Sequence, residues 1–280
     1  MESGKMAIRD DKRVRAAAVQ MASGPNLAGN LAEVERLIGQ AAEQGAELVG
    51  LPENFALMGR READKLDVAE SDGEGPIQDL LAKLASRHRI HLVAGTLPLR
   101  SENPGKVRAA CLLYGPDGRR LGRYDKVHLF DVGVSPTEAY RESDTLEPGS
   151  RAVVVETELG RIGLAVCYDV RFPEQFREMA RQGMEILVLP SAFTAVTGAA
   201  HWRTLVTARA IENLCFTVAP DQGGRHASGR ETYGDSLIVD PWGSVLASRA
   251  KGAGVVVADL DLHRQAEIRR RFPALTHRKF

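Results

Sequence analysis

The feature that most constrains the fold is the order of strand-like and helix-like segments, which alternate from end to end with tight hairpins among them. Short apolar runs suit strands, and the stretches between them carry apolar residues spaced three and four apart, as on one face of a helix. Gly-Pro-Asp-Gly at 115–118 joins two apolar runs in a turn typical of a hairpin. A purely parallel sheet lacks such hairpins, so we expect a layered α/β domain with mixed sheets and outer helices.

The predicted elements cover most of the chain. Strands are expected at 14–20, 48–51, 91–97, 109–114, 119–124, 152–157, 161–167, 185–189, 216–219 and 255–259, with a further hairpin within 236–248. Helices are expected at 31–44, 77–88, 173–181, 199–214 and 262–271. No repeat or linker divides the chain, so we expect residues 1–280 to form a single domain.

Charge and cysteine content argue against several classes of protein. The 37 Lys and Arg residues balance 37 Asp and Glu residues, which disfavours an electrostatic binder of nucleic acid. Cys111, Cys167 and Cys215 are odd in number and far apart, as in a reducing compartment. Residues 1–15 are polar, and no apolar run reaches the roughly 18 residues of a membrane span. We therefore expect a cytoplasmic protein that binds neither nucleic acid nor membrane.

Motifs for nucleotide, metal and serine chemistry are missing from the sequence. There is no GxxxxGK[ST] loop, no GxGxxG after a strand and no GxSxG elbow. The seven histidines lack the spacing of a zinc site, and the acidic residues form no calcium loop. We predict no metal site.

Two segments place a charged side chain at the end of an apolar strand. Glu53 follows the strand 48–51, at the edge where open α/β sheets bind ligands. Lys126 ends the strand 119–124 amid apolar and aromatic neighbours, where it could stabilise an oxyanion. Taken alone, each segment is better explained by an ordinary structural role: a capping or loop glutamate, and a surface lysine with a buried stem.

A third segment places Cys167 where a strand gives way to a turn, shortly before the helix that Pro173 opens. This position exposes the sulfur at the sheet edge and leaves the backbone N–H of Tyr168 free for a developing oxyanion. Cys111 and Cys215, by contrast, have the apolar surroundings of core residues.

Glu53, Lys126 and Cys167, in this order and with these surroundings, resemble the nitrilase superfamily of carbon–nitrogen hydrolases over essentially the whole chain. The resemblance implies a four-layer α-β-β-α sandwich, no metal or organic cofactor, and Glu142 as a second glutamate of the site. It also implies a homodimer or higher homo-oligomer, formed through a helical layer to which Phe176 and Met179 would belong.

Residues 190–213 resemble the Nit branch, and residues 224–243 resemble the deaminated glutathione amidases within it. Asp235 stands where that branch often has histidine, and the segment 130–141 differs from known forms in length and composition. The implied substrate carries carboxylates, so Arg171 is a candidate to bind one; an ion pair within the structure is the other interpretation. Further candidates to contact the substrate are Tyr168, Phe193, Thr194 and Thr197.

The resemblance implies an amidase in which Glu53 deprotonates Cys167, a thioester forms, and water releases the acid. The expected small-molecule substrate is deaminated glutathione, giving 2-oxoglutarate and cysteinylglycine. The alternatives are an ω-amidase acting on 2-oxoglutaramate, a carbamoyl or other small-amide hydrolase, and a noncatalytic binding module on the same fold.

Overall fold

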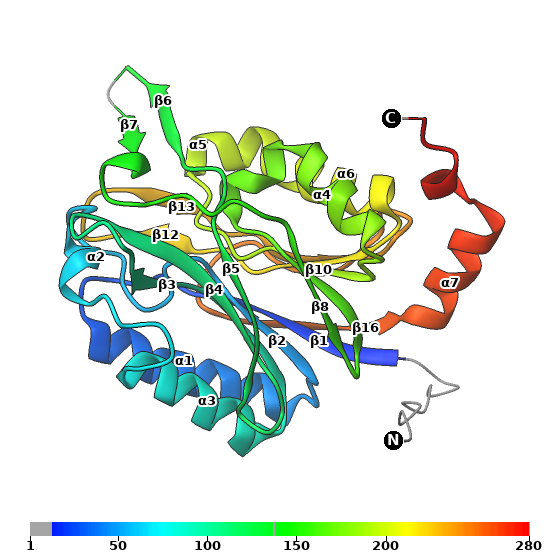
Figure 1. Cartoon of the computed structure of the whole chain (residues 1–280), viewed down its shortest axis with the longest axis horizontal. Helices are drawn as coiled ribbons and strands as arrows, with labels where there is room; N and C mark the ends of the chain where they lie inside the picture. Colours follow the sequence, from blue (N-terminus) through cyan, green and yellow to red (C-terminus); the bar gives the residue numbers. More distant parts are fainter. Residues whose placement is uncertain (1–12, 137, 280) are drawn as a thin grey trace.

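Two six-stranded sheets lie face to face in the computed structural model, which describes residues 13–136 and 138–279. Helices cover the outer side of each sheet, so that the layers run helix, sheet, sheet, helix (Figure 1). The expected layered α/β fold with mixed sheets is therefore confirmed. The polar stretch at 1–12 lies outside the described residues.

The first sheet contains β1 (Arg13–Gln20), β2 (Leu48–Leu51), β3 (His91–Arg100), β4 (Val107–Tyr114), β5 (Arg120–Asp125) and β16 (Gly254–Asp261). The second contains β8 (Val153–Thr157), β9 (Gly160–Leu164), β10 (Ile186–Val188), β11 (Phe216–Ala219), β14 (Ser236–Val239) and β15 (Val245–Arg249). The strand orders are β16-β1-β2-β3-β4-β5 and β15-β14-β11-β10-β9-β8. Both sheets are mixed: β1 runs parallel to β2 and antiparallel to β16.

The helices and small elements complete the chain. The helices are α1 (Leu27–Glu43), α2 (Asp64–Asp67), α3 (Pro76–His88), α4 (Pro173–Arg181), α5 (Ala195–Thr197), α6 (Arg203–Asn213) and α7 (Leu262–Arg271). Short 3₁₀ turns span Glu142–Asp144, Cys167–Arg171 and Ala274–Thr276, and a π turn spans Gly198–Trp202. Two small hairpins stand apart from the sheets: β6 (Asp131–Ser135) with β7 (Glu138–Arg141), and β12 (Gly223–Arg225) with β13 (Glu231–Tyr233).

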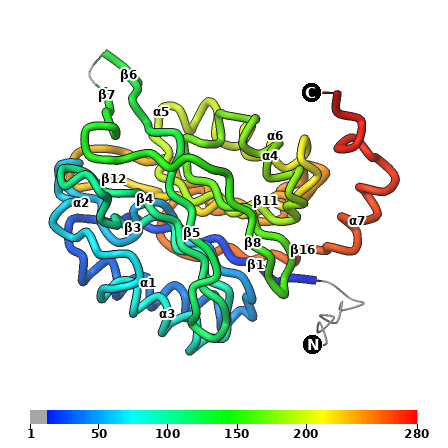
Figure 2. Tube along the Cα trace, in the orientation of Figure 1, coloured from blue at the N-terminus to red at the C-terminus, as the bar shows by residue number. Residues whose placement is uncertain are grey.

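The core is built from strands that bury apolar residues on both faces. In β1, Ala16 and Ala18 face the core between the sheets, whereas Ala17 and Val19 face the core beneath α1 and α3. The last strand, β16, lies beside β1 in the first sheet (Figure 2) and also packs against β14 and β15 of the second sheet. Burial of this apolar surface is the main force that holds the layers together.

The structure corrects two expectations from the sequence. Phe176 and Met179 on α4 are fully buried within the chain, so they are not available to contact another subunit. The helix expected at 199–214 is not a uniform α-helix, because a π turn over Gly198–Trp202 runs directly into α6. Among the described residues, no helix is long and apolar enough to cross a bilayer.

Candidate active site

Side chains from both sheets meet at one end of the sandwich. Glu53 lies two residues beyond β2 and Lys126 directly follows β5, both in the first sheet. Cys167 follows β9 of the second sheet and opens a 3₁₀ turn. The three residues expected to act together are therefore brought together, although they come from strands of two different sheets.

Lys126 is the centre of a buried ion-pair network. Its Nζ lies 2.8 Å from Glu53 Oε1, and 3.0 and 2.8 Å from Glu142 Oε1 and Oε2. Burial alone would lower the pKa of Lys126, but Glu142 and Glu53 raise it well above its usual value. The lysine is therefore a cation, which suits the stabilisation of an oxyanion.

Glu142 is held as a carboxylate. Burial alone would raise its pKa, but Lys126 and Lys65 lower the pKa to about 2. The backbone N–H of Phe130 also donates to Glu142 Oε2 at 2.9 Å. These contacts point both oxygens of Glu142 at Lys126, so the geometry suits positioning of the lysine better than proton transfer.

Cys167 occupies a strained backbone conformation in the turn between β9 and α4. Its φ is +48°, in the left-handed region that non-glycine residues seldom adopt. Its N–H donates to the carbonyl of Pro190 at 2.9 Å, which fixes the turn against the end of β10. Strain of this kind is found at functional sites where the surrounding structure holds a residue in place.

The Cys167 thiol is protonated in the resting protein. Burial and then Glu53 raise its pKa well above the usual value, and Lys126 offsets this only in part. A buried thiol is a weak nucleophile until a base removes its proton. Glu53, which acts electrostatically on the sulfur and lies beside Lys126, is in position to do so.

Asp169 supports this turn and was not predicted from the sequence. Its fully buried carboxylate accepts hydrogen bonds from Val166 N at 2.8 Å and from the Tyr124 hydroxyl at 2.6 Å. It also accepts from His128 N at 3.1 Å. One side chain thus ties the turn that carries Cys167 to the segment around Lys126.

A narrow pocket opens beside the cysteine, with only about 10 Å³ of free space. It is lined by Phe130, Glu142, Cys167, Tyr168, Ala192, Phe193, Thr194, Thr197 and Arg230. The candidates Tyr168, Phe193, Thr194 and Thr197 therefore border the nucleophile, and their contact with substrate stays a prediction.

Arg171 is not among the residues that line this pocket. Its Nη1 lies 3.3 Å from His201 Nδ1, and its guanidinium carbon lies 5.3 Å from the centre of the Phe193 ring. The arginine therefore stacks on an aromatic residue of the pocket wall. Its predicted role in carboxylate binding stays a prediction.

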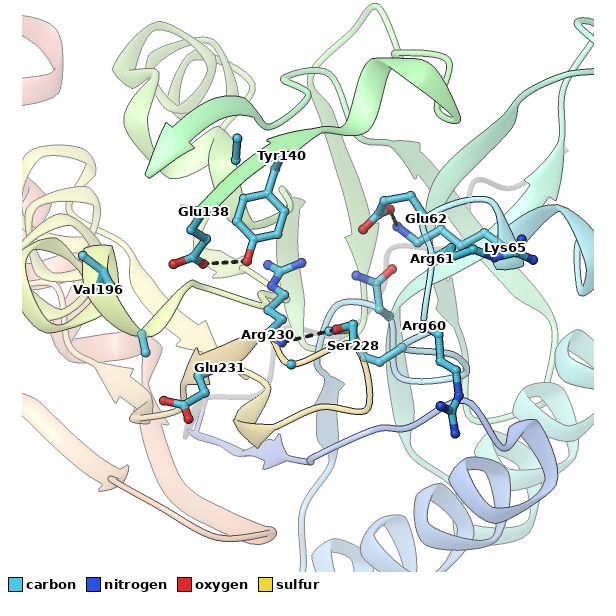
Figure 3. Close-up of a pocket in the computed structure, with 16 residues that line it drawn as sticks. Arg60, Arg61, Glu62, Lys65, Glu138, Tyr140, Val196, Ser228, Arg230 and Glu231 are labelled. Carbon is cyan, nitrogen blue, oxygen red and sulfur yellow. Dashed lines mark hydrogen bonds and ion pairs between the residues drawn. The ribbon is translucent and has the colours of Figure 1, made fainter. Parts of the chain in front are cut away.

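A larger cavity of about 620 Å³ adjoins the narrow pocket (Figure 3). Arg230, just before β13, lines both spaces. Tyr140 of β7 lines the larger one, so the segment 130–141 supplies part of its wall. Neither Arg230 nor Tyr140 was a candidate from the sequence.

Asp235, at the position where the resemblance leads one to expect histidine, forms an ion pair with Arg203. Arg203 Nε and Nη2 donate to its carboxylate at 3.1 and 2.6 Å, and Trp202 Nε1 donates to its carbonyl at 2.9 Å. Asp235 does not line the pocket at Cys167. Among the described residues, no cluster of His, Cys, Asp and Glu could hold a metal ion.

A cysteine on a strained turn, facing a buried carboxylate and a buried ammonium group, has the parts of a thiol-dependent hydrolase. Residues 15–270 match the family model of carbon-nitrogen hydrolase. The chain belongs to this family and is accordingly a hydrolase of carbon–nitrogen bonds.

Three known proteins illustrate the relationship. A deaminated glutathione amidase of Synechocystis is 44% identical over 268 residues, which cover 95% of this chain and 98% of the relative. Omega-amidase NIT2 of Xenopus tropicalis is 34% identical and covers 95% of each chain. The solved NitFhit protein of C. elegans is 36% identical with a TM-score of 0.89, and the match covers 96% of this chain and 65% of that chain.

Proposed function

We propose that this protein hydrolyses the amide bond of deaminated glutathione, releasing 2-oxoglutarate and cysteinylglycine. The observation that carries the catalytic part is the buried contact of Lys126 Nζ with Glu53 at 2.8 Å, in a site that also holds the Cys167 thiol. The substrate follows from the similarity to deaminated glutathione amidases over most of the chain.

In the first half-reaction, Glu53 takes the proton from Cys167, and the thiolate attacks the carbonyl carbon of the amide. Lys126 and the backbone N–H of Tyr168 stabilise the oxyanion, and such donors are typically worth about 3 kcal/mol each. Glu53 then passes the proton to the amine, the carbon–nitrogen bond breaks, and the acyl group remains on Cys167 as a thioester.

In the second half-reaction, Glu53 removes a proton from water, and the hydroxide attacks the thioester carbonyl. The same two donors stabilise the second oxyanion, and the proton returns to sulfur as the acid leaves. Throughout, Glu142 keeps the ammonium group of Lys126 in place. The residues supply every proton transfer, so the proposed cycle uses no cofactor.

The main alternative is an ω-amidase that acts on 2-oxoglutaramate, the activity named in the Xenopus relative. Other small-amide or carbamoyl hydrolases share the same catalytic residues, whereas a noncatalytic binding module would turn over none of these substrates. A panel of deaminated glutathione, 2-oxoglutaramate and simple nitriles separates these functions. We expect the highest kcat/KM with deaminated glutathione, since binding energy from both ends of the substrate can be used at the reacting carbon. A higher value with 2-oxoglutaramate or a nitrile would contradict the proposed substrate.

We also propose that the protein works as a cytoplasmic homodimer or higher homo-oligomer. Large apolar side chains are exposed at Ile211, Trp242 and Phe272, with 47%, 58% and 53% of their surface accessible. Trp242 and Phe272 already pack edge to face, with ring centres 5.8 Å apart. An exposed aromatic cluster of this kind is typical of a subunit interface.

A further inference from the structure

Arg230 is a shielded cation without an acidic partner in the described part of the chain. Its Nη2 donates to the carbonyl of Ala192, and its guanidinium carbon lies 4.8 Å from the centre of the Tyr140 ring. Its Nε is inaccessible to solvent and has no hydrogen-bond partner. None of the ion pairs among the described residues includes this arginine.

Arg209, a buried arginine, shows how such a charge is normally satisfied. Arg209 donates from Nε to the carbonyl of Val170 at 2.9 Å and pairs through Nη1 with Glu212. A guanidinium group cannot lose its charge in a protein, so removing it from water without a counter-ion is costly. Glu53 and Glu62 favour the charge of Arg230 through space, but no carboxylate of the described residues contacts the guanidinium group directly, and an anion in the pocket would supply that contact.

The position of Arg230 specifies where that anion would lie. The residue lines the narrow pocket together with Cys167, and it also lines the 620 Å³ cavity outside (Figure 3). An anionic group on Arg230 would therefore belong to the molecule whose carbonyl faces the thiol. Glu138 lies beside the ring of Tyr140 but accepts no hydrogen bond from Arg230; its Oε1 accepts from the Tyr140 hydroxyl at 2.6 Å.

We propose that Arg230 is the specificity-determining residue that binds the carboxylate on the acyl half of the substrate. The planar guanidinium matches a carboxylate with two parallel hydrogen bonds, and the Tyr140 ring and the Ala192 carbonyl hold it in place. The leaving amine then extends into the larger cavity. The identity of the acid rests on the proposed function, whereas the requirement for an anionic acyl group does not.

The test compares three amides that differ in their carboxylates. Deaminated glutathione has a carboxylate on each half, 2-oxoglutaramate has one on the acyl half only, and pentanamide has the same five-carbon acyl chain with none. Arg230→Gln should lower kcat/KM for the first two by roughly 10- to 100-fold, because an unpaired carboxylate loses its charge-assisted hydrogen bonds. The value for pentanamide should change less than about threefold on the same reasoning.

Two further variants control for charge and position. Arg230→Lys should recover only part of the loss, since lysine lacks the planar fork. Arg225→Gln removes an exposed arginine of the same hairpin that does not line the pocket, and should leave all three values unchanged. A second readout is calorimetric binding of 2-oxoglutarate to Cys167→Ser, in which Arg230→Gln should raise Kd by roughly 10- to 100-fold.

The outcomes separate this proposal from the proposed function. An equal loss on all three amides, or an unchanged Kd for 2-oxoglutarate, would overturn the role of Arg230. A loss confined to deaminated glutathione would overturn it too, by placing the carboxylate of the leaving dipeptide on Arg230. If the unaltered enzyme ignores deaminated glutathione, but Arg230→Gln still distinguishes 2-oxoglutaramate from pentanamide, the proposed substrate fails and the arginine assignment stands.

Discussion

Both carboxylate oxygens of Glu142 lie within 3.0 Å of Lys126 Nζ. Glu53 reaches the same nitrogen through Oε1 at 2.8 Å. The lysine is thus shared between two acids, and of these Glu53 is the one that raises the pKa of the Cys167 thiol. We therefore expect substitutions of Glu53 and of Glu142 to have different effects on the reaction.

Replacing the nucleophile should separate chemistry from stability. Cys167→Ala should abolish turnover and leave the melting temperature nearly unchanged, because a small residue at this turn loses little packing. Cys111→Ala and Cys215→Ala should each cost roughly 1–2 kcal/mol of unfolding free energy and retain activity per folded molecule, since both thiols are core residues. Assays and melting curves of the three variants check this; substantial turnover by Cys167→Ala would rule out the thioester mechanism.

The resting thiol should react slowly with a neutral alkylating agent. Burial and Glu53 raise the pKa of Cys167 well above the usual 9.0, so the thiol form predominates at neutral pH. The rate of labelling by iodoacetamide, followed by mass spectrometry, should therefore rise only above that value. Lys126→Met should move the rise to still higher pH, because the lysine lowers the pKa of this thiol. A labelling rate already at its plateau at pH 7 would contradict the assignment.

Glu142 should stabilise the fold in a pH-dependent way. Its pKa is about 2 in the folded protein against 4.5 ordinarily, so it binds fewer protons when folded and its stabilising effect is complete above pH 4.5. The effect is lost as pH falls from 4.5 toward 2. Urea unfolding of the unaltered protein and Glu142→Gln should show a free-energy difference that shrinks over this range. A difference independent of pH would show that the charge of Glu142 does not stabilise the fold.

The same variant tests the role of Glu142 in catalysis. If it positions Lys126 and does not move protons, Glu142→Gln should lower kcat by roughly 10- to 100-fold without abolishing turnover, as expected for loss of a supporting contact. Glu53→Gln should be far more severe because it removes the base. If the two substitutions lower kcat equally, Glu142 does not have a positioning role that is separate from proton transfer by Glu53.

The oligomeric state can be tested at the exposed aromatic cluster. Light scattering at micromolar concentration should give at least twice the 30.4 kDa mass of one chain. Trp242→Glu should shift the mass toward the monomer, since a charge would be buried in an apolar contact. A fully active 30.4 kDa monomer would refute the proposed assembly.

The sequence predicted the larger elements and the three residues that meet at the candidate site. Residues 262–271 form α7 and 48–51 form β2 as expected, because periodicity and length mark such elements well. The hairpin β12–β13 was missed, since its strands have three residues each and carry glycine and polar side chains without alternation. Arg230 and its partners therefore could not be inferred from the sequence.

Proximity along the chain does not by itself show which side chains line the narrow pocket. Arg171 stands four residues after Cys167 and lies over the Phe193 ring without lining that pocket, so its role in carboxylate binding stays a prediction. Asp169 was overlooked because an isolated aspartate in a turn has no distinctive signal, whereas its role depends on Tyr124 and His128 from a distant strand end. The surroundings of Arg171 and Asp169 both depend on contacts with residues that are distant in the sequence.

The first sheet carries Glu53 and Lys126, and the second sheet carries Cys167. The reaction therefore depends on how the two sheets are aligned. A substitution that disturbs the packing between the two sheets, far from any reacting atom, would move the sulfur relative to Glu53 without unfolding either sheet. A misplacement of about 1 Å can cost on the order of 100-fold in rate. Loss of activity on heating or mutation should then precede loss of secondary structure, so that catalysis reports the alignment of the halves earlier than circular dichroism does.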